Sequence, residues 1–192
     1  MVVERSRGKK LVYVSEDLLD AISAISKKKG ESISKFVEDN LKEAVRVEQL
    51  GHDSGEMVSL LESLQVQRVL GGTFVPLDVL TQMCNRSFVQ EKDLLMSLWF
   101  DSGKLYGKYI VERYGSPIAA FMNLLKTMRW DLNEVAIREE KSASKFRCVS
   151  TSLNESGTDL LSQFIEGAII AMGFKVTRKE SLKGLIMIDF SR

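Results

Sequence analysis

The spacing of hydrophobic residues divides the N-terminal quarter of the chain into three short elements. Residues 9–14 alternate along their length and are rich in strand-forming side chains, which predicts a β-strand. Residues 15–29 and 32–47 repeat hydrophobic side chains at helical spacing, and Gly30 separates the two segments. The order expected here is therefore strand, helix, turn, helix.

The remaining residues carry a different pattern, in which helical spacing comes first and strand-like segments follow. One strongly hydrophobic helix is expected between two pairs of strands. Helices followed by a sheet with one crossing helix indicate an α+β domain with an antiparallel sheet. The expected helices are residues 56–70, 77–83, 91–114, 117–129 and 158–172, and the expected strands are residues 132–138, 145–152, 175–179 and 185–190.

Glycines and polar residues at 51–55 interrupt the pattern between the two halves and are typical of a hinge. We therefore expect a basic arm at residues 1–8, a small N-terminal domain at residues 9–49, a linker at residues 50–55 and an α+β domain at residues 56–192.

The predicted N-terminal domain cannot complete its hydrogen bonding alone. A strand without a neighbouring strand leaves backbone N–H and C=O groups unpaired, which costs free energy where they are buried. A second copy of the chain supplies the neighbour: two strands pair antiparallel about a two-fold axis, and four helices close a shared core. The sequence therefore predicts an obligate homodimer, and leaves higher oligomers open.

Residues 8–48 resemble the ribbon-helix-helix family of repressors, the methionine-repressor and Arc-repressor type. The resemblance rests on the order KKLVYV, SEDLLDAISAI and KKKGESISKFVEDNLKEAV, with a serine after the strand and Gly-x-Ser before the second helix. It implies that the two paired strands form a ribbon that enters the major groove of double-stranded DNA.

Alternation along the predicted strand assigns its residues to two faces. With Val12 and Val14 in the shared core, Lys9, Leu11 and Tyr13 face the DNA, whereas the opposite register exposes both valines. We prefer the first register because it puts a lysine and a phenol on the outer face. Lys9 and Tyr13 are expected to hydrogen-bond bases or phosphates, and Leu11 to pack against a thymine methyl, where the family usually has a polar side chain.

The start of the second helix is a candidate phosphate clamp. Gly30 allows a tight turn, Ser32 is expected to cap the helix, and the free N–H groups near Ser34 point outward beside Lys35. The alternative is a Gly-x-Ser turn that only joins two helices. The basic ribbon ahead of the turn makes us prefer the clamp.

Further positive charge lies in the arm and at the end of the first helix. Arg5 and Arg7 are expected either to make non-specific phosphate or minor-groove contacts or to be disordered. Lys27, Lys28 and Lys29 suit the negative end of the first helix. A solvated helix end is therefore the preferred interpretation of the three lysines, and DNA contact is the alternative.

Residues 90–192 resemble a small-molecule-binding fold shared by the four-vinyl-reductase domain, the haem nitric-oxide-binding domains and the TRAPP vesicle-tethering subunits. The resemblance rests on the order strand, strand, helix, strand, strand, on the sequence FIEGAIIAMGF and on Gly103 and Gly107, one helical turn apart. The haem-binding version would need a proximal histidine, and residues 56–192 contain none.

What the second resemblance implies is a pocket for a small apolar ligand. Aromatic side chains are the candidates to line it, and the alternative, which we prefer, is that they belong to the core. The candidates are Trp99, Phe100, Tyr106, Phe121 and Trp130.

Composition changes this picture little. The chain has 192 residues, of which 44% are hydrophobic and 28% charged, with a formal net charge of +1, which fits a globular protein. No hydrophobic run approaches the roughly 20 residues of a membrane span, and the N-terminus lacks the apolar segment of a secretory signal. We therefore expect a cytoplasmic protein with no membrane partner, in which Cys84 and Cys148 are free thiols.

The sequence offers no catalytic or metal-binding arrangement. His52 is the only histidine and falls in the linker, so neither a Ser-His or Cys-His pair nor metal-ligand spacing is available. We expect no enzymatic activity, no metal and no cofactor. The function that fits best is a sequence-specific, homodimeric transcription regulator of the repressor type with a ligand-sensing or dimerisation domain. The alternatives are an antitoxin and another protein-interaction module whose N-terminal domain mainly dimerises.

Overall fold

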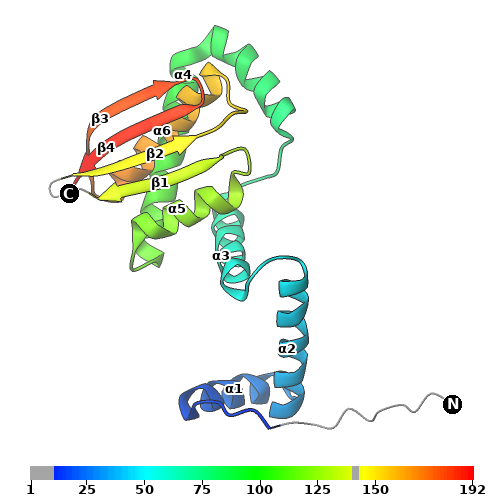
Figure 1. Cartoon of the computed structure of the whole chain (residues 1–192). Coiled ribbons are helices and arrows are strands. Elements are labelled where there is room, and N and C mark those ends of the chain that lie inside the picture. Colours follow the sequence, from blue (N-terminus) through cyan, green and yellow to red (C-terminus); the bar gives the residue numbers. More distant parts are fainter. Residues whose placement is uncertain (1–10, 140–142) are drawn as a thin grey trace. The chain divides into compact units, whose positions relative to one another are not determined.

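The computed structural model describes residues 11–139 and 143–192 (Figure 1). Six helices and one four-stranded antiparallel sheet lie within these residues, so the α+β class predicted from the sequence is confirmed. The chain separates into two compact units, Met1–Met57 and Val58–Arg192.

Two helices joined by a turn make up most of the first unit. Helix α1 spans Glu16–Lys29 and helix α2 spans Ile33–Gln49, as the hydrophobic spacing predicts. Gly30 ends α1 with a φ of 70°, a conformation that glycine adopts without strain, and its N–H donates to the carbonyl of Lys27 at 3.1 Å. The Oγ of Ser32 accepts a hydrogen bond from the N–H of Lys35 at 3.2 Å. The predicted cap of the second helix is therefore confirmed.

Residues 11–15 have no regular secondary structure. The strand predicted over residues 9–14 is therefore wrong for the single chain over residues 11–14, and residues 9 and 10 lie outside the described part. The physical reason is that a strand needs a hydrogen-bonded neighbour, and this segment has none in one copy of the chain. Pairing with a second copy remains a prediction.

The sheet of the second unit has the order β1-β2-β4-β3. Helix α6 (Glu155–Ala171) connects β2 to β3 and packs against one face of the sheet (Figure 1). Along β4, Ile186, Ile188 and Phe190 are buried on that face, and the residues between them are only partly covered. This alternation is typical of a sheet covered by helices on one side. The strands are β1 (Glu134–Glu139), β2 (Ser144–Val149), β3 (Lys175–Leu182) and β4 (Leu185–Ser191).

Three helices precede the sheet: α3 (Ser54–Leu70), α4 (Leu77–Arg113) and α5 (Pro117–Met128). Two helices were expected where α4 runs, and the structure joins them across a kink at Glu91, whose φ of −138° and ψ of 45° are not helical. At the outer edge of the sheet, the pairing of β3 with β4 shifts register between Val176 and Arg178, which is a β-bulge.

Helices α4 and α6 cross at three glycines. A Cβ atom on Gly103 would lie 2.0 Å from the carbonyl oxygen of Phe164, and one on Gly167 would lie 2.2 Å from that of Phe100. At Gly107 the corresponding distance, to the carbonyl oxygen of Ala168, is 2.4 Å. The absence of side chains therefore sets the distance between the helices, as predicted for the glycine pair of α4.

An ion pair stabilises the turn between α5 and β1. The Nε and Nη2 atoms of Arg129 each donate to the Asp131 carboxylate at 2.7 Å, and both side chains are largely buried. Burial by itself would raise the pKa of Asp131, but the Arg129 guanidinium outweighs it, so the pKa lies below its ordinary value of 3.8.

Arg129→Met is expected to lower the free energy of unfolding by about 2 kcal/mol at about pH 7 and by much less at about pH 3. Because the folded-state pKa of Asp131 is depressed, its contribution is complete above the unfolded-state value and is lost as pH falls through the folded-state pKa. Urea unfolding across this pH range measures the difference, with Arg113→Met on an exposed position as control. A difference that stays constant with pH contradicts the assignment.

Candidate nucleic-acid interface and cavities

The residues predicted to form the outer face of the ribbon are only partly described. Arg5, Arg7 and Lys9 lie outside the described residues. Leu11 and Tyr13 are 89% and 94% exposed, so both side chains are free to contact another molecule. An exposed leucine beside an exposed phenol is a surface that a binding partner can desolvate.

The predicted phosphate clamp lies at the start of α2. Ser32, Ser34 and Lys35 are all exposed there, and Ser32 caps the helix through its hydroxyl. Lys29, at the end of α1, lies with its Nζ 5.0 Å from the centroid of the Phe36 ring. The N–H groups of the first turn and two lysines are therefore accessible around the α1–α2 turn, an arrangement that suits an anion.

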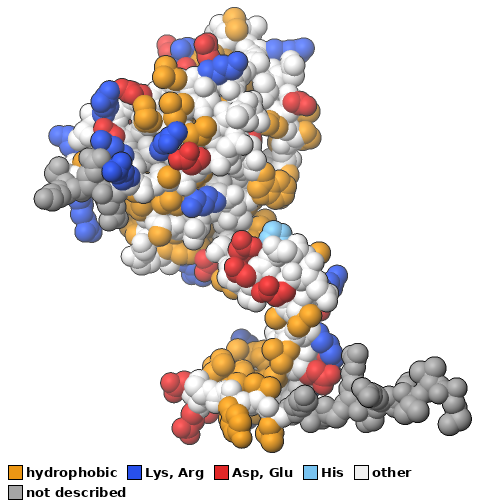
Figure 2. Space-filling model, in the orientation of Figure 1, with side chains coloured by type: hydrophobic (Ala, Val, Ile, Leu, Met, Phe, Trp, Pro, Cys, Tyr) orange, Lys and Arg blue, Asp and Glu red, His pale blue; other side chains and the backbone are white. Residues whose placement is uncertain are grey.

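The first unit has almost no core of its own. Among residues 11–57, only Ser26 and Val47 are buried. Figure 2 shows hydrophobic side chains gathered over the surface of the α1 region. Burial this small does not offset the conformational entropy lost in ordering two helices. The exposed large hydrophobic side chains are Leu11, Val12, Tyr13, Val14, Leu18, Leu19, Ile25, Ile33, Leu41, Val45, Leu50 and Met57.

The aromatic residues proposed to line an apolar pocket lie apart from the cavities of the second unit. Tyr106 and Phe121 are buried, and their ring centroids lie 5.1 and 6.1 Å from that of Phe164, which is core packing. Trp99 is half-buried on α4, and Trp130 is 82% exposed after α5. Phe100 is also half-buried on α4, and none of the five candidates lines either cavity described below.

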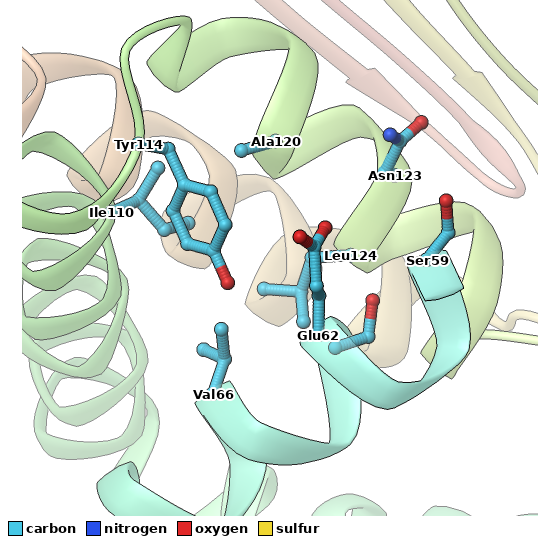
Figure 3. A pocket seen from close by; sticks show the side chains of 9 residues that line it. Ser59, Glu62, Val66, Ile110, Tyr114, Ala120, Asn123 and Leu124 are labelled. Carbon is cyan, nitrogen blue, oxygen red and sulfur yellow. The ribbon is translucent and has the colours of Figure 1, made fainter. Parts of the chain in front are cut away.

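A cavity of about 20 Å³ lies between α3, α5 and the end of α4 (Figure 3). Its apolar side is formed by core residues, and its polar side by hydroxyl, carboxylate and amide groups. The phenol of Tyr114 and the carboxylate of Glu62 point toward the same space. The lining residues are Ser59, Glu62, Ser63, Val66, Ile110, Tyr114, Ala120, Asn123 and Leu124.

Two polar groups of this cavity, the Tyr114 phenol and the Ser63 hydroxyl, differ from ordinary exposed groups in pKa and in hydrogen bonding, respectively. Burial and, second, the Glu62 carboxylate raise the pKa of Tyr114. Ser63 is 4% exposed, and its hydroxyl makes no hydrogen bond to any residue in the described ranges. The described residues contain no buried side-chain oxygen or nitrogen without a hydrogen-bond partner, so the Ser63 hydroxyl oxygen stays accessible to the cavity or to solvent.

A larger open cleft, of about 420 Å³, lies between α4 and the start of α6. Asn85 lines this cleft, and the Oδ1 atom of Asn85 accepts hydrogen bonds from Asn154 Nδ2 at 2.7 Å and from Ser156 Oγ at 2.6 Å. These amide and hydroxyl groups therefore bind one another. Phe88, Val89, Glu155 and Lys183 complete the lining.

The described ranges contain no group of three or more His, Cys, Asp and Glu residues that could hold a metal ion. Cys84 and Cys148 are free, as predicted, and burial raises the pKa of Cys148 to about 12, so its thiol stays protonated and unreactive at neutral pH. Within the described part of the chain, no helix combines the length and apolarity needed to cross a bilayer.

The chain matches no protein-family model and no curated protein. A solved structure from work on heme distortion in the H-NOX family aligns with a TM-score of 0.39 at 12% identity, covering 77% of this chain and 88% of that chain. At this level of similarity, the alignment supports no conclusion about the function of the present chain.

Proposed function

We propose that the chain is a homodimeric DNA-binding regulator of the ribbon-helix-helix type, with an α+β unit that senses a ligand or adds to the dimer. The observation that carries the proposal is the first unit, in which two helices follow a segment without regular secondary structure and leave their hydrophobic side chains exposed. A second copy of the chain is the proposed occupant of this surface.

Self-association would provide the first unit with the two things it lacks, a strand that pairs with residues 11–14 and a core that covers its hydrophobic side chains. The segment at residues 11–14 has no strand to pair with, and Leu18, Leu41 and Val45 have no core to enter. Two-fold pairing would give each segment its antiparallel neighbour and would bury both helix pairs against each other. Val12 and Val14 would then face the shared core, and Leu11 and Tyr13 would face outward.

Two features support double-stranded DNA as the partner of the dimer. A two-stranded ribbon fits the major groove, where Lys9, Leu11 and Tyr13 would reach the base edges. The exposed first turn of α2, with Ser34 and Lys35, would hold a flanking phosphate. Affinity should therefore fall steeply with salt concentration, because phosphate contacts release counterions.

The double variant Lys9→Ala/Tyr13→Ala is expected to bind DNA at least ~10-fold more weakly than the unaltered chain, because two groups that face the groove are removed from each copy. Duplexes that the purified protein selects from random or genomic DNA serve as the ligand, and a labelled-duplex titration gives the dissociation constant. Lys126→Ala, on the exposed side of α5, is the control.

Equal affinity in the double variant, or no binding by the unaltered chain, would instead favour a protein-interaction module. An antitoxin fits less well, since such tails are usually short and disordered, whereas the second unit has a folded core of its own.

A further inference from the structure

We propose that the cavity between α3, α5 and the end of α4 binds a primary ammonium group, either free ammonium or the head of a small amine. The site itself is independent of DNA binding. Its regulatory consequence, given below, rests on the proposed function.

The charge of the lining selects a cation. Among the nine residues that line the cavity there is one carboxylate, Glu62, and no lysine or arginine. Glu62 forms no ion pair within the described residues. Among the lining side chains, an anion would therefore meet a like charge and a cation an opposite charge, which water partly screens because Glu62 is exposed.

The oxygen atoms around the cavity match the hydrogen-bond donors of an ammonium group. A primary ammonium group has three N–H donors and no acceptor. Glu62, Tyr114 and Ser63 each offer an oxygen that can accept, and the Ser63 hydroxyl has no partner in the described chain. A bound head group would therefore give the accessible Ser63 hydroxyl a hydrogen-bond partner.

The size of the cavity limits what can enter. A volume of about 20 Å³ accommodates one water-sized group, and an ammonium ion is of that size. Val66, Ile110 and Leu124 form the apolar side and offer no oxygen for a hydrated or multiply coordinated metal ion. A small amine would insert only its head and leave its carbon atoms toward the open side.

Part of the cavity lining belongs to α3, the helix within which the boundary between the two units falls. The lining residues from α3 are Ser59, Glu62, Ser63 and Val66. Helix α3 is also linked to α4 by the hydrogen bond from Tyr106 Oη to Gln67 Oε1, at 3.1 Å. A bound ammonium group would add hydrogen bonds across the contact of α3 with α4. If the arrangement of α3 and α4 that binds ammonium has a different affinity for DNA from the arrangement without ammonium, the ligand changes the DNA affinity of the protein.

Thermal unfolding of the full chain tests the site without DNA. Ammonium chloride and methylammonium chloride are each expected to raise the unfolding midpoint saturably, by about 3 °C, relative to sodium chloride at equal ionic strength. Tetramethylammonium chloride, which has no N–H donor, is expected to behave as sodium chloride does. A response to ammonium alone identifies the free ion, and a response to both identifies the head group of an amine.

Variants separate specific binding from a general salt effect. Glu62→Gln and Ser63→Ala are expected to abolish and weaken the ammonium-dependent rise, respectively, whereas Asp93→Asn, on an exposed position of α4, retains it. Equal midpoints in all four salts, or a full rise in Glu62→Gln, would mean that the cavity holds only water and would overturn the proposal.

Measuring DNA affinity with and without methylammonium separates ammonium binding from its proposed effect on DNA binding. The DNA dissociation constant is expected to change at least ~3-fold at saturating methylammonium in the unaltered chain and not in Glu62→Gln. A midpoint shift without this change rejects the link to DNA and supports the site. Absence of DNA binding rejects the proposed function and leaves the thermal test unaffected.

Discussion

A chain that carries Leu41→Glu is expected to sediment as a monomer at concentrations where the unaltered chain is a dimer. Leu41 is 56% exposed on α2 in the single chain, on the same side as Val45, and the proposed dimer buries it. Each copy would lose about 2 kcal/mol of hydrophobic burial and would place a carboxylate in an apolar contact. Over two copies, the dimer dissociation constant should rise by at least ~10³-fold.

Sedimentation equilibrium over a concentration series measures this change directly. Asn40→Glu introduces the same charge one position earlier, on another side of α2, and serves as the matched control. DNA binding should be lost together with the dimer in Leu41→Glu and kept in Asn40→Glu. A monomeric unaltered chain at working concentration would overturn the dimer and the ribbon together.

Gly103→Ala is expected to destabilise the second unit by about 3 kcal/mol or more. The new Cβ would lie 2.0 Å from the carbonyl oxygen of Phe164, so α4 and α6 would have to move apart along their whole crossing. Neither helix can give way by a side-chain rotation, because the opposing atom belongs to the backbone. The lost contacts lie in the centre of the core, near Tyr106 and Ile165.

Urea unfolding followed by tryptophan fluorescence measures the loss, because both tryptophans of the chain, Trp99 and Trp130, belong to the second unit. Gly115→Ala is the matched control, since a Cβ there meets no atom within 4 Å. It is expected to change the free energy of unfolding by less than about 1 kcal/mol. Similar losses in both variants would show that the crossing tolerates a methyl group.

Elements that depend on local periodicity could be predicted from the sequence. Helices α1 and α2 have repeated hydrophobic positions with Gly30 between them, and the four strands have alternating or β-branched residues. The kink of α4 at Glu91 could not be predicted, because no glycine or proline lies nearby to signal it. Residues 11–14 have strand-forming side chains, but composition does not say whether a partner strand exists in the same chain.

The small cavity escaped prediction for a different reason. Glu62 and Ser63 lie on α3, and Tyr114 follows α4 more than forty residues later, so only the tertiary fold brings them together. A weak signal was present in α3, where Ser59 and Ser63 lie one helical turn apart beside Glu62. Serines one turn apart beside a glutamate are common on solvated helices, so the pattern alone does not identify a cavity. The aromatic residues proposed for the pocket share only their residue type, and residue type does not distinguish the core from a cavity lining.

The bulge in β3 affects whether two copies of this protein can associate through the edge of the sheet. An unpaired outer strand is a template on which another chain can extend the sheet, and uncontrolled extension leads to aggregation. The register shift between Val176 and Arg178, together with charged side chains along the same strand, makes β3 a poor template. Intermolecular strand addition is therefore discouraged at this margin of the second unit. This protects one edge of the sheet, since β1 forms the opposite edge, and under the proposed function chains would join at the segment before α1.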